Sequence, residues 1–289
     1  MIIDSFIQYL RFERRFSPHT ITAYQSDLLQ FVSYLKKQYE IDNVEDANHT
    51  LIRSWIVSLM QDGITSRSVN RKITVLKTFY KFALKQGKVK TNPMLKITSP
   101  KISKRLPVFV DEKAMQRLFD EELFSTEDHE EVRNMLIMEL FYSTGMRLSE
   151  LLQLRDEDFD TYNNTLRVTG KRSKQRILPL SSTMANNLRT FIKKFNINGF
   201  IFTNKNGKPL YAKFVYNLVK TYLTKITTLD KRSPHVLRHT FATHMLNSGA
   251  DINAVKEILG HSSLAATQVY THNTIEKLKN VYKQAHPRA

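Results

Sequence analysis

The stretch TNPMLKITSPKISKRLP, residues 91–107, interrupts the hydrophobic periodicity of the chain and divides it in two. It contains three prolines and has neither the 3.6-residue spacing of a buried helix face nor the alternation of a strand. We therefore expect a linker over 91–106 between an N-terminal domain, 1–90, and a C-terminal domain, 107–289. A chain of 289 residues is long enough for two ordinary domains, each with its own core.

The N-terminal domain is predicted to be a four-helix, all-α domain. Its clearest helix, TSRSVNRKITVLKTFYKFALKQG, has Thr65 or Ser66 as N-cap and Gly87 after its last turn. Another helix begins at Ser17, followed by Pro18 in the first helical position. Apolar residues recur at helical spacing and predict the core positions Phe6, Ile7, Leu10, Ile21, Tyr24, Leu28, Phe31, Leu35, Trp55, Ile56, Leu59, Val69, Ile73, Leu76, Tyr80 and Ala83.

The C-terminal domain mixes helices with a small amount of sheet. Helices are expected over 113–123, 131–144 and 148–154, and again after residue 181. Within NNTLRVTGKRSKQRILPL, two short strands flank a turn that contains Gly170. The turn lacks the second glycine and the following helix of a phosphate-binding loop, so the sequence does not indicate ATP binding.

Basic residues dominate the chain and are unevenly distributed. The formal net charge is +17. Residues 63–110 contain twelve basic side chains and no acidic one, and residues 161–229 contain thirteen and none. A generally basic, solvated surface would explain the total, but two long acid-free segments favour two faces that bind one polyanion.

The helix near residues 65–87 shows how one such face could form. Its apolar stripe must be buried, so the cations on the opposite side would line up along the exposed surface. A row of this kind is often only solvated, yet the absence of acids favours contacts with phosphates. The predicted row consists of Arg67, Arg71, Lys77, Lys81 and Lys85.

Several classes of protein are excluded or disfavoured by what the sequence lacks. With no cysteine, the chain has no disulfide, thiolate metal site or cysteine nucleophile. The first residues, MIIDSFIQYLRFERR, do not resemble a signal peptide, because Asp4 interrupts the apolar run. No uncharged apolar run is long enough to span a bilayer. We expect a cytosolic protein.

The segment SPHVLRHTFATHMLNSG concentrates histidines on one predicted helix, capped by Ser233 and ended by Gly249. Three interpretations are open: a metal site, histidines packed in the core, or a site for an anion. A zinc site is disfavoured because Val236 stands where an H-E-x-x-H helix carries its glutamate, and no metal is expected. Core or capping positions suit His239, His244 and His272.

His235 and Arg238 lie on one face near the start of this helix. An imidazole, a guanidinium and the positive end of the helix dipole all favour a negatively charged group such as phosphate.

Five motifs then follow one another in a familiar order: TGMRLSEL, GKRSKQR, HVLRHTFATH, LGHSSLAATQVYTH and HPRA. Together they resemble the tyrosine recombinase, or phage integrase, family, and within it the Xer-type recombinases that resolve chromosome dimers. The resemblance extends over essentially the whole chain. It implies a helical, SAM-like core-binding domain, a mainly α catalytic domain with a small β-sheet, and a C-shaped clamp on DNA.

The resemblance also implies a set of catalytic roles. Tyr270 matches the nucleophile, whose phenol needs help to attack near neutral pH. His235 matches the residue that takes up the tyrosine proton. Lys171 matches the general acid, with Lys174 as the rival candidate. The phosphate ligands would be Arg147, Arg238 and His261.

One position departs from the family pattern. Arg172 follows the turn lysine where the family commonly has glycine, which adds a side chain to the turn and a cation near the cut site. We count Arg172 and Lys174, with Arg67, Arg71, Lys77 and Lys81, as candidate DNA contacts. Glu150 could pair with Arg147 three residues before it and orient it.

The resemblance implies site-specific recombination through a covalent 3′-phosphotyrosine bond, without metal, ATP or another cofactor. The expected partners are a double-stranded recombination site, a second recombinase in a homo- or hetero-tetramer, and a septal DNA translocase. The C-terminal helix, with Ile275, Leu278, Val281 and Tyr282 on one face, would either pack on its own domain or dock on a neighbouring subunit. The alternatives are a mobile-element integrase, a type IB-like topoisomerase and a DNA-binding module without catalysis.

Overall fold

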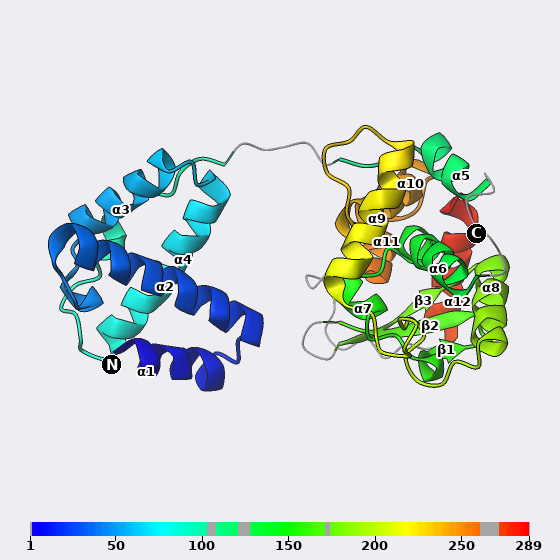
Figure 1. Cartoon of the computed structure of the whole chain (residues 1–289), viewed down its shortest axis with the longest axis horizontal. Coiled ribbons are helices and arrows are strands. Elements are labelled where there is room, and N and C mark those ends of the chain that lie inside the picture. Colours follow the sequence, from blue (N-terminus) through cyan, green and yellow to red (C-terminus); the bar gives the residue numbers. More distant parts are fainter. Residues whose placement is uncertain (1, 103–107, 121–127, 171–173, 261–271, 289) are drawn as a thin grey trace. The chain divides into compact units, whose positions relative to one another are not determined.

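The computed structural model describes residues 2–102, 108–120, 128–170, 174–260 and 272–288. The chain forms two compact units, Met1–Arg105 and Leu106–Ala289 (Figure 1). Each unit has a hydrophobic core of its own. No described helix is long and apolar enough to cross a membrane.

The described residues of the first unit form helices joined by loops, with no strand among them, as the sequence predicts. Ser17 caps the long helix α2 and Thr65 caps α4, and each side-chain oxygen accepts a hydrogen bond from the backbone N–H three residues on. Gly87, with φ +65°, follows the end of α4. The elements are α1 (Ile2–Gln8), the π-helical turn η1 (Tyr9–Glu13), α2 (Pro18–Tyr39), η2 (Val44–Asp46), α3 (His49–Gln61), α4 (Ser66–Lys85) and η3 (Pro93–Lys96).

Helix α4 is the centre of the first core, because α1, α2, α3 and η3 all contact it. The predicted stripe from Val69 to Ala83 is buried. Val75, Phe79 and Phe82 beside it are also buried, so the buried face of α4 is wider than the predicted stripe. Phe79 meets Phe6 of α1 edge to face, with ring centroids 5.3 Å apart.

The first core extends further along the chain than the sequence indicates. Met94 and Ile97 lie inside the predicted linker of 91–106, yet both are buried in the first core, and η3, which carries Met94, contacts α3 and α4. Asn92 caps the short helix η3 that carries Met94. Two apolar residues of the predicted linker, too few to show a period, therefore belong to the core of the first unit.

The second unit combines helices with one small sheet. The sheet has the order β1-β2-β3 and is antiparallel, with Val168 opposite Arg176. The β2–β3 pair confirms the hairpin expected around Gly170, whereas the two-residue strand β1 was not predicted. The elements are α5 (Glu112–Asp120), α6 (His129–Thr144), α7 (Leu148–Leu151), η4 (Asp156–Asp158), β1 (Phe159–Asp160), β2 (Thr165–Thr169), β3 (Gln175–Pro179), α8 (Ser182–Lys194), α9 (Ala212–Ile226), α10 (Pro234–Asn247), α11 (Ile252–Leu259) and α12 (His272–Ala285).

Helices α6 and α10 pack against each other in the middle of this unit. Helix α6 ends at Gly145, as expected, in the left-handed conformation with φ +59°. A Cβ at this position would lie 2.5 Å from the Phe241 ring and 2.8 Å from the Leu259 side chain. Gly145 therefore allows the end of α6 to approach α10 and α11 closely, which brings the segment after it to the candidate site.

Helix α12, red in Figure 1, contacts β3, α10 and α11 of its own unit. Leu278, Tyr282 and Ala285 are buried there. His286, directly after the helix, approaches the Tyr142 carbonyl oxygen through its Nε2 at 3.2 Å. The described part of this helix thus packs on its own unit, and docking on a neighbouring subunit stays a prediction.

Candidate active site

Helix α10 brings two of the candidate residues to one place. The Ser233 side chain accepts a hydrogen bond from the Val236 N–H, and Pro234 occupies the first turn, so the helix begins where the sequence predicts. His235 is exposed in the first turn, whereas Arg238, one turn later, is only 8% exposed. The apolar residues Leu237, Phe241 and Met245 fix the rotation of the helix by packing in the core.

Arg238 is buried but remains positively charged. Its Nη1 donates to the carbonyl oxygen of Gly145 at 2.6 Å, and its Nη2 donates to that of Leu259 at 2.5 Å. Burial, followed by the nearby charges of Arg147 and Arg176, lowers the pKa of Arg238 to about 10. The guanidinium is still protonated at neutral pH, although burial has removed most of its contact with water and this disfavours the charged form.

Arg147 lies just before α7 and two residues after Gly145, whose lack of a side chain lets this segment come close to α10 and α11. Its backbone N–H donates to Glu150 Oε2 at 2.7 Å, and its Nη1 donates to Glu150 Oε1 at 2.8 Å. Its Nη2 donates to the Gly260 carbonyl oxygen at 2.9 Å. The side chain is 30% exposed, so it is held at two points and still reaches solvent.

A third arginine completes the group. Arg176 of β3 is buried, and its two terminal nitrogens donate to the two oxygens of Glu150 at 2.6 and 2.8 Å. Burial by itself would raise the pKa of Glu150, but the hydrogen bonds and charge of Arg176, helped by Arg147, lower it, so the carboxylate stays ionised. The expected pairing of Arg147 with Glu150 is present.

The three arginines converge on the end of one helix. Arg176 Nε donates to Ile258 O at 2.6 Å, while Arg238 and Arg147 bind the next two carbonyl oxygens, of Leu259 and Gly260. These are the last carbonyls of α11, the negative end of its dipole. The three arginines thereby join α7, β3, α10 and α11 around one strongly cationic site. Such a site suits a phosphate diester.

The comparisons with known proteins agree with this chemistry. A model of the phage integrase family matches residues 109–277, and a model of the phage integrase N-terminal SAM-like domain matches residues 3–87. The chain belongs to the phage integrase family of tyrosine recombinases. It is 38% identical to the tyrosine recombinase XerC of Bacillus pumilus over 100% of this chain and 97% of that protein. It is 34% identical to the tyrosine recombinase XerD of Staphylococcus haemolyticus over 100% and 99%.

These full-length relatives make the chain a site-specific tyrosine recombinase of the Xer type, and therefore a DNA-binding enzyme. Among solved structures, the XerH site-specific recombinase bound to a palindromic difH substrate matches with a TM-score of 0.71 at 23% identity. That match covers 98% of this chain and 82% of the XerH chain. It shows a shared fold, with the helical SAM-like unit and the mainly helical catalytic unit that the sequence predicts.

Half of the predicted catalytic residues lie in the described part of this recombinase. The structure brings Arg147 and Arg238 together and places His235 on the same helix as Arg238. Lys174 is exposed directly before β3, and its carbonyl oxygen accepts a hydrogen bond from the Gly170 N–H at 2.8 Å. The other predicted site residues, Lys171, Arg172, His261 and Tyr270, lie outside the described residues.

Arg176 was not among the residues predicted for the site. A signal was available, because Arg176 and Leu178 share the inward side of a short strand, where an arginine needs a partner. The partner is Glu150, far away in the sequence. Only the fold shows that the two meet.

The two other histidines of α10, His239 and His244, differ in burial. His244 is buried, and its Nδ1 lies 3.0 Å from the Tyr142 hydroxyl, which confirms a core position. Burial, helped by the neighbouring His235, lowers the pKa of the half-buried His239. Within the described residues, no cluster of three or more His, Asp or Glu side chains could hold a metal ion.

The predicted cationic row of α4 is exposed, comprising Arg67, Arg71, Lys77, Lys81 and Lys85. Arg71 has a further contact that the sequence did not indicate, an ion pair with the buried Asp27 of α2. The same carboxylate accepts a hydrogen bond from the buried Lys72 at 2.8 Å. Arg71 is nevertheless 49% exposed, so part of the side chain remains available to a ligand.

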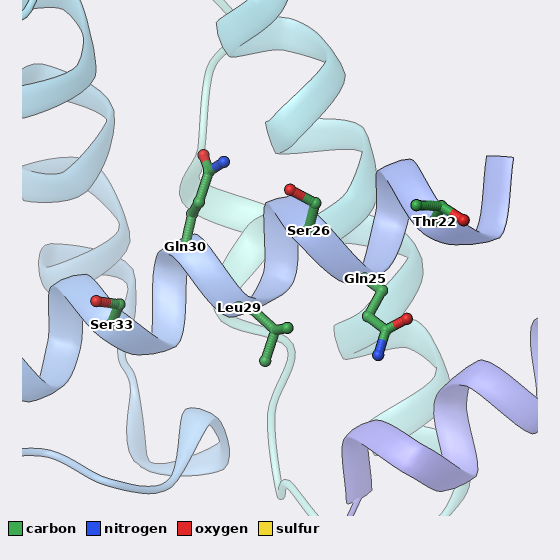
Figure 2. A pocket seen from close by; sticks show the side chains of 6 residues that line it. All are labelled: Thr22, Gln25, Ser26, Leu29, Gln30 and Ser33. Atoms are coloured by element: carbon green, nitrogen blue, oxygen red, sulfur yellow. The ribbon is translucent and has the colours of Figure 1, made fainter. Parts of the chain in front are cut away.

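A shallow pocket lies on α2, the helix that supplies Asp27 (Figure 2). Hydroxyl and amide side chains and the exposed Leu29 line it: Thr22, Gln25, Ser26, Leu29, Gln30 and Ser33. Gln30 also accepts a hydrogen bond from Lys72 at 2.5 Å. The pocket contains no ionisable side chain, so it lacks the groups needed for acid–base or phosphoryl chemistry.

Proposed function

We propose that this recombinase cuts and rejoins DNA through a covalent 3′-phosphotyrosine bond to Tyr270. The observation that carries the proposal is the state of Arg238. Among the described residues, this buried cation donates its hydrogen bonds to neutral carbonyl oxygens, and Arg147 and Arg176 stand close enough to lower its pKa. Glu150 is already bound by two arginines, so the site retains excess positive charge. A phosphate that gains negative charge during the reaction would supply the missing anion.

In the proposed reaction, the Tyr270 hydroxyl oxygen attacks the scissile phosphorus, and the bond from phosphorus to the 5′-oxygen breaks. His235 takes up the phenolic proton. Lys171 gives a proton to the leaving 5′-oxygen, with Lys174 as the alternative donor. Arg147, Arg238 and His261 bind the non-bridging oxygens.

This chemistry explains why no cofactor is needed. The phosphotyrosine bond conserves the energy of the phosphodiester, so a 5′-hydroxyl from another strand can attack it and release Tyr270 without ATP. Two such exchanges, through a four-way junction, recombine two duplexes. The side-chain cations take the part that a metal ion plays in other DNA-cutting enzymes.

Duplex binding is assigned to the exposed cations. Arg67, Arg71, Lys77 and Lys81 of α4 would bind backbone phosphates, with Arg172 and Lys174 closer to the cut site. The full-length similarity to proteins named XerC and XerD supports resolution of chromosome dimers, in the cytoplasm, by a tetramer that includes a second recombinase. A septal DNA translocase is the further partner we propose. A mobile-element integrase is the alternative, and a search for bound sites among genomic fragments would separate the two.

The replacement Tyr270→Phe tests the proposed nucleophile, because it keeps the ring and removes the attacking oxygen. The variant should bind its DNA site as wild type does and form no denaturant-resistant adduct with a nicked suicide substrate. Tyr162→Phe is the matched control, since Tyr162 belongs to the same unit and is 93% exposed. It should form the adduct normally. An adduct that persists in Tyr270→Phe would refute the assignment.

A further inference from the structure

Glu150 is the most completely bonded carboxylate of the described catalytic unit. Its side chain is 0% exposed. Oε1 accepts from Nη1 of Arg147 and Nη1 of Arg176, and Oε2 accepts from the Arg147 backbone N–H and Nη2 of Arg176. Each oxygen therefore serves both arginines. A buried carboxylate of this kind holds its position only while all its donors stay in place.

Arg176 differs from Arg147 in what it can reach. It is 4% exposed, with two nitrogens on Glu150 and the third on the Ile258 carbonyl oxygen. All three nitrogens of its guanidinium are thus bound to the protein. The Arg147 side chain is 30% exposed, which leaves it open to a ligand. A positional effect of Arg176 on the reaction must therefore pass through the residues that it binds, while its charge also lowers the pKa of Arg238.

The close contact with Gly260 shows how tightly Arg176 fits against the end of α11. Gly260 has φ +65°, and a Cβ on it would lie 3.0 Å from Cδ and 3.2 Å from Nε of Arg176. The hydrogen bond from Arg176 Nε to Ile258 O acts on the same turn of chain. The position of the Gly260 backbone is therefore linked to that of Arg176.

These contacts connect Arg176 to both points that hold Arg147. The guanidinium of Arg147 donates to Glu150 Oε1 and to Gly260 O. Arg176 binds the first acceptor directly and fixes the second through Ile258 and the packing on Gly260. A long, partly exposed side chain has many rotamers, and two fixed acceptors select one of them.

We propose that Arg176 is a positioning residue that orients the guanidinium of Arg147 by holding Glu150 and the end of α11 in place. The inference rests on the proposed function, in which Arg147 binds the scissile phosphate. Arg176 contacts neither DNA nor the reacting atoms. Its contribution is to the geometry of the bound phosphate, and so to the cleavage rate rather than to affinity.

The replacement Arg176→Lys tests the proposal in the full-length enzyme. Lysine keeps the charge but loses the planar fork that binds both Glu150 oxygens and Ile258 O together. Single-turnover cleavage of a prebound suicide substrate should slow by on the order of 10–100-fold, as expected for a misplaced catalytic group. The Kd for the DNA site, measured at the same salt concentration, should change little.

Coupling to Arg147 separates positioning from general stabilisation. Arg147→Lys alone should slow cleavage, and adding Arg176→Lys to it should slow cleavage little further, because there is no arginine left to orient. If the two effects multiply instead, Arg176 acts independently of Arg147 and the proposal is wrong. Wild-type cleavage by Arg176→Lys would also overturn it.

Arg133→Lys is the matched control. Arg133 is another buried arginine of this unit, with a hydrogen bond to Thr203 O at 3.0 Å and an ion pair with Glu130. Its replacement should lower the melting temperature while leaving the cleavage rate of bound enzyme unchanged. If Arg176→Lys does not fold, Glu150→Gln breaks the same link from its other side and should show the same dependence on Arg147. If Glu150→Gln cleaves DNA at the wild-type rate, the link between Glu150 and Arg176 does not orient Arg147.

The proposed function and this inference fail differently. If wild-type enzyme forms no Tyr270 adduct, or if Arg147→Lys cleaves normally, the proposed function is wrong. If both of those results are as expected and Arg176→Lys still cleaves at the wild-type rate, only the role of Arg176 is wrong.

Discussion

In each unit of this recombinase, a buried carboxylate binds a buried cation and a partly exposed arginine. In the first unit Asp27 binds Lys72 and Arg71. In the second, Glu150 binds Arg176 and Arg147. Both carboxylate side chains are almost fully buried, and the exposed arginines are 49% and 30% exposed. The electrostatic arrangement is the same in the two units.

The two clusters differ in how many segments they join. Lys72 is a point charge that links α4 to Asp27 and Gln30, both on α2. Arg176 is a planar fork that joins β3 to Glu150 of α7 and to the end of α11. A buried ammonium can stabilise the packing of two helices, whereas a guanidinium can also fix the direction of its neighbours. We infer that the first cluster serves the fold and the second serves the reaction.

The largest expected effect is that of Asp27→Asn on the stability of the first unit. The replacement leaves Lys72 buried without its counter-charge, and removing one partner of a buried ion pair typically costs about 3–5 kcal/mol. Trp55 is the single tryptophan of the chain, is buried in the first unit and lies 5.9 Å from the Lys72 ammonium. Urea unfolding followed by tryptophan fluorescence therefore reports on this unit in the full chain.

Cleavage completes the contrast between the clusters. Asp27→Asn enzyme that is folded and bound to DNA should form the Tyr270 adduct at the wild-type rate, unlike Glu150→Gln. Asp42→Asn is the control, because it breaks the exposed pair between Lys36 and Asp42. It should leave the unfolding midpoint almost unchanged. A slow cleavage rate in folded Asp27→Asn would mean that the two clusters do not divide fold and reaction as inferred.

Much of the fold follows from the sequence, because local signals set the helices. Ser17, Thr65 and Ser233 cap helices where predicted, and Gly145 ends α6. These signals act over a few residues and can be read directly. The family resemblance likewise identified the recombinase fold, which the family models confirm.

What the sequence did not give depends on contacts between distant segments. Arg176 meets Glu150 across 26 positions, and Lys72 meets Asp27 across 45. Helical spacing places Lys72 on the buried stripe beside Val69 and Leu76, but only the fold shows that its partner there is Asp27. Met94 was missed for a related reason, since one residue in a short 3₁₀ turn shows no periodicity.

Acid should weaken the second unit before the first. His286 is buried against the rings of Tyr282 and Tyr142. Burial lowers its pKa to about 4, against the opposing effect of the hydrogen bond to the Tyr142 carbonyl oxygen, and the charges of His244 and Arg288 lower it further. A neutral buried histidine contributes its full stability above the unfolded pKa of about 6.5. As the pH falls from there towards about 4, the unfolded chain binds a proton that the folded chain does not, so up to about 3 kcal/mol is lost.

The two histidines of the first unit, His19 and His49, are not buried. Urea unfolding at pH 7 and at pH 4.5 should therefore show a larger loss by far-UV circular dichroism of the whole chain than by Trp55 fluorescence. His286→Phe keeps a ring for stacking and should reduce the difference between the two pH values, while His49→Gln should not. An equal pH dependence in His286→Phe and wild type would rule out His286 as its source.

The smallest expected effect concerns the exposed row of α4, where charge acts on DNA one phosphate at a time. Replacing Arg67 or Lys81 by glutamine should weaken binding similarly on specific and unrelated duplexes, and each lost contact should reduce the slope of log K against log salt by about 0.9. The rate of adduct formation by prebound enzyme should not change.

Arg71→Gln sharpens the comparison, because Arg71 belongs both to this row and to the Asp27 cluster. If its free half binds phosphate, it should flatten the salt slope as Arg67→Gln does. If the ion pair with Asp27 is its whole role, the slope should stay the same while the Trp55 unfolding transition moves to lower urea. Lys36→Gln, which removes an exposed cation already paired with Asp42, is the control and should leave the slope unchanged.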